Sequence, residues 1–423
     1  MRFHWYWPFA RPEELDWATA TARSGESIVV QVVDRPQAPE AGEFGAVTVV
    51  RDLPDVDRGV SPLTWVPSRA ATYLRRVTAR QRMWRSRRFD LVHLHYLNRF
   101  TDGLSRLPNP LVLSVHDVTP HTLRLGGRVE HAMLHQTYRR GDALIVHHQA
   151  LRDRLVAEFG IDAARVHVVH HQVFTAPEVG APPSDRPPMI LFFGALRANK
   201  GLAVLLEAMR ELATQDVRLV IAGRGDSDQE ALARAAADAD PRISAEIGFV
   251  PLERKWELFT EASLAVLPYV SFASQRGVLH DAYGHGRPVV VSDVGALGES
   301  VRADGTGLVA LPGDPHSLAE QITTALAPQS WRSFSLGAQA VRRERTPQRT
   351  GQRLREVYDI VLGGCRAGGS RRKLVRRRRQ WTGPHGRKRW SPGVHRAYPW
   401  PWRRRVQAPE CGRTDRESTS GGQ

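Results

Sequence analysis

Short apolar runs alternate with longer amphipathic segments along most of this 423-residue chain, and this alternation constrains its fold more than any other feature. The apolar runs have the length of buried strands, and the segments between them have the apolar period of helices. Strands that alternate with helices form parallel sheets, because a crossover helix returns the chain to the same end of the sheet. The pattern therefore predicts an α/β protein built from βαβ units.

Residues 1–174 contain the first series of these units. We expect strands near residues 3–7, 27–33, 47–50, 91–95, 111–115, 143–147 and 166–169. We expect helices near residues 12–23, 67–85, 129–140 and 150–159. This series predicts a first Rossmann-like domain.

A second series begins after residues 175–188, a proline-rich segment without apolar period that has the composition of a linker. We expect strands near 190–193, 218–222, 243–247, 264–268, 288–292 and 307–311, and helices near 202–212, 229–237, 252–261, 278–285 and 315–326. Residues 189–345 thus predict a second Rossmann-like domain, and residues 346–363 predict a C-terminal helix that could pack back on the first domain. A chain of this length can bury two cores, so the expected architecture has two domains facing a central cleft, with ligands at the carboxyl ends of the strands.

The last residues, 364–423, differ in kind from the rest of the chain. They hold 17 Lys and Arg against 3 Asp and Glu, whereas the other 363 residues hold 43 against 41. The net charge of +16 therefore belongs almost entirely to this tail. Blocks of like charge among Gly, Pro and Trp predict disorder, and an out-of-frame translation would have the same appearance. The functional alternative is an anchor for anionic lipid or RNA.

A cationic loop lies between the strand at 190–193 and the helix at 202–212, and it carries Arg197 and Lys200. Unpaired backbone N–H groups and the helix dipole attract anions at a helix start and disfavour cations there. Two cations in that place therefore indicate a bound anion rather than two solvated side chains. A planar guanidinium beside an ammonium suits a diphosphate.

A second loop and helix follow about eighty residues later, at 274–293. Together, Gly-Ala-Leu-Arg-Ala-Asn-Lys-Gly at 194–201 and Asp-Ala-Tyr-Gly-His-Gly-Arg-Pro-Val-Val at 281–290 resemble the donor-binding half of glycosyltransferase family 4. Members of that family are retaining, nucleotide-sugar-dependent enzymes of GT-B architecture. They carry Gly-x-x-x-x-x-Lys-Gly after a strand and a Glu-x7-Glu loop that ends in Gly-x-Pro-Val. The resemblance covers roughly residues 1–360, more closely in the second half.

The resemblance implies a site for the sugar donor. Arg197 and Lys200 would hold the diphosphate and, as catalytic residues, stabilise the charge that develops on the leaving phosphate. Asp281 stands at the second Glu of the family loop and would accept hydrogen bonds from the ribose hydroxyls; pairing with a nearby cation is its alternative role. The full predicted set of donor-binding residues is Gly194, Arg197, Lys200, Gly223, Val250, Gln275, Gly277, Val278 and Asp281.

The donor loop departs from the family pattern at its start. Ala273 occupies the place of the first Glu, and the segment Ser-Gln-Arg-Gly-Val at 274–278 resembles a variant of this loop in which Gln275 replaces the acidic group. Gln275 could bind sugar hydroxyls, and the N–H groups around Gly277 could meet the sugar or the distal phosphate. Phe249, beside the predicted base-binding Val250, could equally be a core residue.

The resemblance also implies an acceptor site in the first domain. His116 follows a strand and would face the acceptor as a catalytic and binding residue, with Asp117 orienting its ring. A buried, satisfied histidine is the alternative. His95, His147 and His148 also end strands toward the same cleft. The glycine-rich first loop of the family is replaced by Pro-Phe-Ala-Arg-Pro-Glu at 8–13, where Arg11 could face an anionic acceptor.

No cofactor other than the nucleoside-diphosphate sugar is expected, and no metal is assigned. No His-x3-His with a carboxylate is present, both cysteines lie in the tail, and the Asp-Ser-Asp at 226–228 is not a motif on which GT-B relatives depend. Specific nucleic-acid binding is not expected. No apolar run reaches the ~20 residues of a transmembrane helix. We expect a cytoplasmic protein and consider peripheral contact with the inner face of a membrane.

These features predict a glycosyltransferase that moves a sugar from a nucleoside diphosphate to a hydroxyl of a polysaccharide, glycolipid or small molecule, with retention of configuration. The alternative is a catalytically degenerate GT-B subunit that binds a ligand or a partner.

Overall fold

The computed structural model describes residues 1–36, 38–55, 62–98, 102–103, 105–116, 118, 127–173, 186–271 and 277–378, with the backbone alone at 13, 62–69 and 365–378. The chain divides into two units, residues 1–370 and residues 371–423. Most of the predicted linker 175–188 and of the predicted tail lies outside the described residues. The domain bounds drawn from the sequence therefore stay predictions.

The first sheet has eight strands in the order β3-β4-β2-β1-β5-β6-β7-β8, and every neighbouring pair is parallel except β3 with β4. The strands are β1 (Arg2–Tyr6), β2 (Ser27–Val33), β3 (Gly42–Phe44), β4 (Val47–Leu53), β5 (Leu91–Leu94), β6 (Leu111–Ser114), β7 (Ala143–Val146) and β8 (Val166–Val168). The helices between them are η1 (Pro12–Glu14), α1 (Leu15–Thr21), α2 (Pro62–Ser86), α3 (Gly127–Arg140), α4 (Gln149–Phe159) and η2 (Ala163–Arg165). The seven predicted strands are present, and β3 is an addition.

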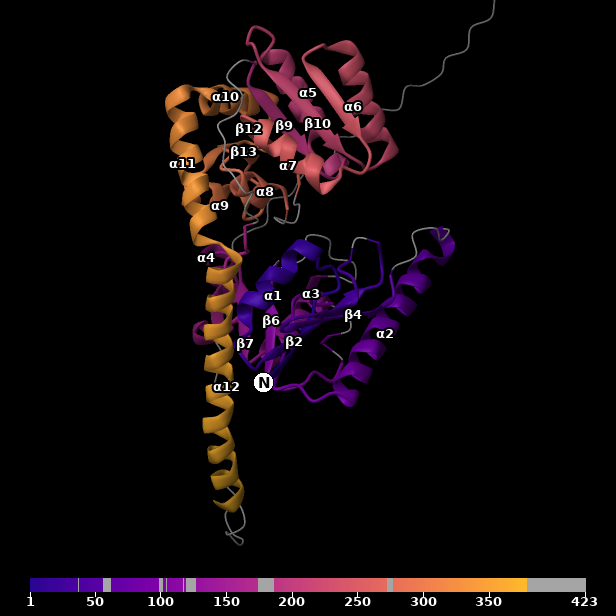
Figure 1. Ribbon diagram of the computed structural model, residues 1–423, viewed down its shortest axis with the longest axis vertical. Helices are drawn as coiled ribbons and strands as arrows, with labels where there is room; N and C mark the ends of the chain where they lie inside the picture. Colours follow the sequence, from indigo (N-terminus) through magenta and orange to yellow (C-terminus); the bar gives the residue numbers. More distant parts are fainter. Residues whose placement is uncertain are drawn as a thin grey trace, which may run out of the picture. The chain divides into compact units, whose positions relative to one another are not determined.

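The second sheet has six strands in the order β11-β10-β9-β12-β13-β14, all parallel. The strands are β9 (Met189–Phe193), β10 (Arg218–Gly223), β11 (Ile243–Ile247), β12 (Leu264–Leu267), β13 (Val289–Ser292) and β14 (Gly307–Ala310). The helices are η3 (Ala198–Lys200), α5 (Leu202–Glu211), α6 (Ser227–Ala239), α7 (Leu252–Glu261), α8 (Val278–Gly284), α9 (Leu297–Asp304), α10 (Pro315–Leu326), α11 (Pro328–Glu344) and α12 (Pro347–Arg378). The predicted α/β class is confirmed, with two sheets that are parallel apart from the edge strand β3 (Figure 1).

Alternate residues of β9 face opposite cores, because side chains alternate across a strand. Ile190 and Phe192 pack in one cluster with residues of α5 and α10. Met189 and Leu191 pack in another cluster with residues of α7 and α8. Helices therefore cover both faces of the second sheet, and its central strands β9 and β12 are apolar throughout, as in other sheets buried on both sides.

Two helices of the second half, α9 and α11, are absent from the sequence prediction. Helix α9 is short, and α11 is mostly polar, with a glycine at 337 in its interior. That glycine has a packing role, because a Cβ on Gly337 would lie 2.2 Å from the carbonyl oxygen of Gly305. This close approach to the end of α9 explains why residue 337 is a glycine.

Helix α12 follows the second sheet in the chain but packs on the first (Figure 1). Tyr358 is fully buried among first-domain residues, with its ring 5.5 Å from that of Phe3 and its hydroxyl 2.7 Å from Nδ1 of His93. Arg355 donates to Oε2 of Glu26 at 2.9 Å, and both side chains are almost fully buried. The core of the first domain therefore includes the C-terminal helix.

Among the described residues, no helix combines the length and the apolar composition that crossing a bilayer requires.

The ion pair between Arg80 and Asp102 gives a first prediction. Nη2 of Arg80 lies 2.6 Å from Oδ1 of Asp102, and both side chains are buried; Oδ2 accepts from the backbone N–H of Asn98 at 2.8 Å. Asp102→Ala leaves a buried guanidinium uncompensated and should lower the free energy of unfolding by about 3–5 kcal/mol. Chemical denaturation measures this change in the free energy of unfolding. Glu158→Ala, which removes an exposed pair with Arg154, is the control and should cost about 0.3–0.5 kcal/mol; equal losses would contradict the prediction.

Candidate functional site

The loop after β9 is fixed against the loop after β10 by backbone contacts. The N–H of Gly194 donates to the carbonyl oxygen of Ala222 at 2.9 Å, and the N–H of Leu196 donates to that of Arg224 at 3.0 Å. A Cβ on Gly223 would lie 1.8 Å from the carbonyl oxygen of Gly194. Only glycine allows this approach, and the φ of +145° at Gly223 also favours glycine. The predicted donor residues Gly194 and Gly223 are thus in direct contact.

The same loop is held on its other side by the segment after β12. The N–H of Val270 donates to the carbonyl oxygen of Asn199 at 3.1 Å. A Cβ on Gly201, which has φ of +71°, would lie 1.8 Å from the carbonyl oxygen of Pro268. The turn that carries the two predicted cations is therefore fixed before any ligand binds.

Arg197 and Lys200 lie at the two ends of this turn. Arg197 is the exposed N-cap residue of η3, and Lys200 is its last residue, half-buried. Nζ of Lys200 lies 3.9 Å from the centroid of the Tyr269 ring. Burial, and then the positive charge of Arg197, lower the pKa of Lys200 to about 8. A bound anion would favour the charged form, so the turn has the electrostatics of an anion site.

The first motif meets the second at Val278, the first residue of α8. A Cβ on Gly194 would lie 3.4 Å from Cγ2 of Val278. The preceding residue, Gly277, has φ of +101°. The structure therefore brings together Gly194, Gly223, Gly277 and Val278, four of the predicted donor residues.

Asp281 is buried and paired with a cation. Nζ of Lys255 lies 3.1 Å from its Oδ1, and its carbonyl oxygen accepts from Nδ1 of His285 at 2.8 Å. This ion pair with Lys255 is the alternative role that the sequence left open for Asp281. A contact of Asp281 with ribose stays a prediction.

Val250 and Phe249 follow the carboxyl end of β11. Val250 is half-buried against the second-domain core, whereas Phe249 is 67% exposed. The suggestion that Phe249 is a core residue is therefore wrong. The role of Val250 beside the nucleobase stays a prediction, and Gln275 lies outside the described residues.

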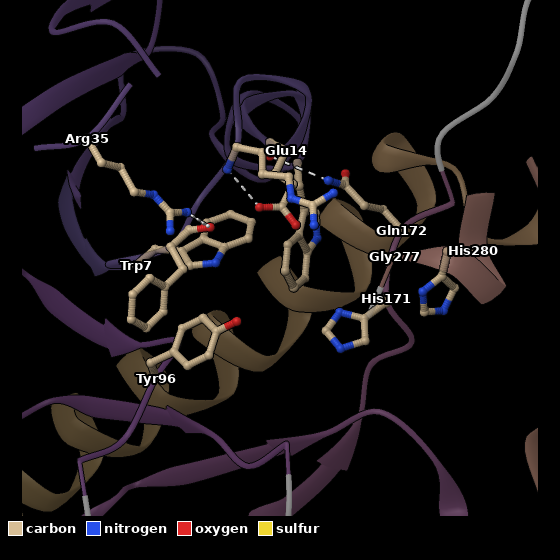
Figure 2. A pocket seen from close by; sticks show the side chains of 11 residues that line it. Trp7, Glu14, Arg35, Tyr96, His171, Gln172, Gly277 and His280 are labelled. Atoms are coloured by element: carbon tan, nitrogen blue, oxygen red, sulfur yellow. Dashed lines mark hydrogen bonds between the residues drawn. The ribbon is translucent and has the colours of Figure 1, made fainter. Parts of the chain in front are cut away.

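A pocket of about 310 Å³ lies next to Gly277 (Figure 2). Aromatic rings form part of its wall, and polar side chains of both signs form the rest. It is lined by Trp7, Phe9, Arg11, Glu14, Trp17, Arg35, Tyr96, His171, Gln172, Gly277 and His280. We call it the Arg11 pocket.

Arg11 connects the predicted acceptor side with the donor loop. Its backbone N–H donates to Oε2 of Glu14 at 2.9 Å, and its Nη2 lies 3.9 Å from the place of a Cβ on Gly277. Arg35, on the same pocket, donates to the carbonyl oxygen of Phe9 at 3.3 Å. A pocket with two guanidinium groups and aromatic walls suits an anionic, ring-containing acceptor.

His116 lies beside this pocket, 5.1 Å from the ring of Tyr96 and 5.5 Å from that of His171. Its Nε2 donates to the carbonyl oxygen of His95 at 2.6 Å, and its Nδ1 lies 2.9 Å from Nε2 of His147. Its predicted partner Asp117 lies outside the described residues. The half-buried ring is held by neighbours of the first sheet, and its catalytic role stays a prediction.

Several pocket residues were missed by the sequence analysis, although a signal for them exists. Arg35, Tyr96 and His171 each follow the carboxyl end of a strand, respectively β2, β5 and β8. Parallel strands bring these ends to one edge of the sheet, where ligands bind. Applying that rule to every strand would have found them, whereas His280, on α8, has no such signal.

Two family models match the chain. Residues 187–327 match the model described as "Glycosyl transferases group 1", and residues 15–176 match "Glycosyltransferase Family 4". The first match contains the turn with Arg197 and Lys200 and also Asp281. The second contains His116 and also Arg35, Tyr96 and His171 of the Arg11 pocket, whereas Arg11 itself precedes it.

Known proteins are similar over most of the chain. Glycogen synthase from Mycobacterium tuberculosis is 25% identical and covers 73% of this chain and 80% of its own. A D-inositol 3-phosphate glycosyltransferase from Xylanimonas cellulosilytica is 28% identical, over 60% of this chain and 68% of its own. The crystal structure of Anabaena Alr3699/HepE in complex with UDP-glucose has a TM-score of 0.60 at 17% identity and covers 85% of this chain and 100% of its own. This last likeness concerns the fold, which is GT-B.

Replacing Gly223 tests how the turn is built. Gly223→Ala forces a Cβ into the carbonyl oxygen of Gly194 and should cost roughly 1–3 kcal/mol of stability or more. Gly248→Ala is a matched control, because Gly248 has φ of +146° but no heavy atom within 4 Å of its Cβ position. Thermal or chemical unfolding compares them. A loss of stability no larger in Gly223→Ala than in Gly248→Ala would contradict the structural role of the contact between Gly223 and Gly194.

Proposed function

We propose that this chain, whose two halves match the glycosyltransferase group 1 and family 4 models, is a GT-B glycosyltransferase that transfers a sugar from a nucleoside-diphosphate sugar to an acceptor hydroxyl with retention of configuration. The observation that carries this proposal is the fixed turn with Arg197 and Lys200, which lies against the loop that leads to the Arg11 pocket. A leaving diphosphate and an acceptor would there occupy neighbouring places.

The proposed role of the turn is to stabilise charge that forms during reaction. When the glycosyl bond breaks, negative charge grows on the departing phosphate oxygen. Cations that are already fixed near that oxygen stabilise this charge without having to reorganise, which lowers the barrier. Arg197 would contribute a planar fork, and Lys200 a point charge held against Tyr269.

Retention fits a front-face reaction, in which the acceptor attacks from the side where the diphosphate leaves. The leaving phosphate would take the proton of the acceptor hydroxyl, so the step requires no protein nucleophile. Glu14 is a carboxylate on the wall of the Arg11 pocket, but its Oε2 accepts the N–H of Arg11 and thereby helps to hold the loop. We therefore assign Glu14 to positioning Arg11.

The solved relative indicates a class of donor, and the Arg11 pocket indicates a class of acceptor. The solved relative holds UDP-glucose, so UDP-sugars are the first donors to try. Two curated relatives are named for a glucan and for an inositol phosphate. The two guanidinium groups of the Arg11 pocket favour an acceptor of the inositol-phosphate kind, which carries a phosphate or a carboxylate. A cytoplasmic location, with or without membrane contact, stays part of the proposal.

A second candidate, a subunit that binds nucleotide sugars without turnover, has one observation in its favour. Ala273 replaces the first Glu of the family loop, and the carboxylate of Asp281 is paired with Lys255. Both changes reduce the acidic groups available to a sugar or ribose. Incubation with labelled nucleotide sugars and a panel of acceptors separates the two functions, because transfer or hydrolysis requires an enzyme and saturable binding alone does not.

Removing either cation of the turn should weaken the reaction. We expect Arg197→Ala and Lys200→Ala each to lower kcat/KM by ~10²-fold, because each removes charge that faces the leaving group. Arg210→Ala removes an exposed cation from the other end of α5 and serves as the control. Steady-state transfer assays measure all three. Unchanged turnover in both turn variants would remove the site assignment.

Donor binding should weaken in alkaline solution. The pKa of Lys200 is lowered to about 8, so its ammonium is charged below pH 8 and loses its proton above it. A diphosphate prefers the charged form, and the Kd for a nucleoside diphosphate should rise by up to ~10-fold per pH unit above pH 8. Calorimetry at several pH values tests this. Lys200→Arg stays charged over the range, and its Kd should change little; an equal rise in that variant would contradict the role of Lys200.

A further inference from the structure

Three histidines meet at the carboxyl ends of three neighbouring strands. His116, His147 and His171 follow β6, β7 and β8, which are adjacent in the first sheet. One nitrogen of each ring takes part in a group whose atoms all lie within 4.8 Å of one another. His147 is buried, and the other two are half-buried. We call these residues the histidine cluster.

Backbone carbonyls fix which ring nitrogens face the centre of the cluster. Nε2 of His116 donates to the carbonyl oxygen of His95 at 2.6 Å, and Nδ1 of His147 donates to that of Val169 at 2.8 Å. A carbonyl oxygen only accepts, so these two nitrogens carry the hydrogens. Nδ1 of His116 and Nε2 of His147 are the nitrogens turned toward each other, 2.9 Å apart.

Two neutral imidazole rings in this arrangement would repel each other. If both rings are neutral, each has already used its single hydrogen on a carbonyl, and two lone pairs face each other at 2.9 Å. A positive species between them removes this repulsion, either an additional proton or a metal ion. A ring nitrogen turned to a metal while the other donates to a backbone carbonyl is the usual arrangement of metal-binding histidines.

We propose that the histidine cluster binds one divalent transition-metal ion, with Zn²⁺ as the ion it suits best. Imidazole nitrogen is a preferred ligand of zinc, and three histidines form a common zinc site. Zn–N bonds of about 2.0–2.1 Å in tetrahedral geometry place ligand nitrogens about 3.3 Å apart. The pair His116–His147 therefore has to open by only a few tenths of an ångström.

His171 requires a larger adjustment. Its ring is stacked on that of His147, with centroids 3.5 Å apart and planes at 26°, whereas rings that bind one ion point their nitrogens at a common centre. A turn of the ring about its side-chain torsions makes that possible, and the half-buried position of His171 on the wall of the Arg11 pocket provides the room. No metal was expected from the sequence, because the chain has no His-x3-His with a carboxylate, both cysteines lie in the tail and GT-B relatives do not depend on an Asp-x-Asp motif; histidines on adjacent strand ends form no such local pattern.

The proposed ion would have one coordination position left for a ligand. Three protein ligands leave the fourth position of zinc for water or a substrate oxygen. Because His171 lines the Arg11 pocket, that position would be accessible from the pocket. The ion would add to the positive charge of Arg11 and Arg35 and favour a phosphate or carboxylate there. His116 would then act through the ion and not on the acceptor directly.

Spectroscopy of the Co²⁺-substituted protein tests the site without requiring an assay of transfer. Full-length, tag-free protein is treated with a chelator, dialysed and titrated with Co²⁺, followed by Zn²⁺. We expect visible absorption typical of tetrahedral Co²⁺ at one ion per chain, displaced by Zn²⁺. The absorption should be lost in His171→Ala and in His147→Gln. His316→Ala, which removes an exposed histidine paired with Glu211, is the matched control and should bind as the wild type does.

Two results would overturn the proposal. One is the absence of tetrahedral absorption in the wild type. The other is Co²⁺ binding that is equal in the wild type, His171→Ala and His316→Ala, which would place the ion elsewhere on the chain. Unfolding curves of each variant show whether it folds, and a Zn²⁺-dependent rise in the melting temperature of the wild type alone provides a second readout. If a proton and not a metal ion lies between His116 and His147, neither the cobalt absorption nor the Zn²⁺-dependent rise in melting temperature will occur.

Discussion

The approach of Gly223 to the carbonyl oxygen of Gly194 is the constraint on which the proposed active site depends. It joins the loops that follow the adjacent strands β9 and β10, at their carboxyl ends. Those contacts hold the turn that follows in a conformation that places Lys200 over Tyr269 and Gly194 against Val278. The charge of the turn and the start of α8 are thereby fixed relative to each other. A rigid arrangement of this kind is what electrostatic stabilisation of a transition state requires.

The sequence alone predicts the features that repeat along the chain or that follow from local chemistry. Alternation of apolar runs predicts both sheets, and the cationic turn and the Gly-x-Pro-Val ending predict the pair of loops that meet at Gly194 and Val278. The polar helix α11 was missed because the residues it buries, Ser335, Ala338 and Val341, are few and small and include no long apolar side chain. The ion pair of Asp281 could not be foreseen either, because Lys255 lies on α7, another helix, and nothing local relates the two residues.

The Arg11 pocket and the histidine cluster have the same origin. Both contain residues that follow strand ends and that are separated by dozens of positions in the chain, such as Arg35, Tyr96 and His171. Each looks ordinary in its own segment, since one histidine or tyrosine after a strand has no meaning by itself. The order of the strands in the sheet brings them together, and that order is a property of the tertiary fold. Sequence reasoning therefore finds loops more readily than it finds pockets.

The return of α12 to the first sheet also bears on how the protein is made. Phe3 and Trp5 emerge from the ribosome first, but Leu354 and Tyr358, which complete their core, are translated only after the entire second domain. Until then the core between the first sheet and α1 lacks the side chains of α12, and the buried side chain of Glu26 lacks Arg355. During biosynthesis the second domain can therefore finish folding before the first, which is the reverse of their order in the chain, and the nascent first domain is the part that a chaperone would have to protect.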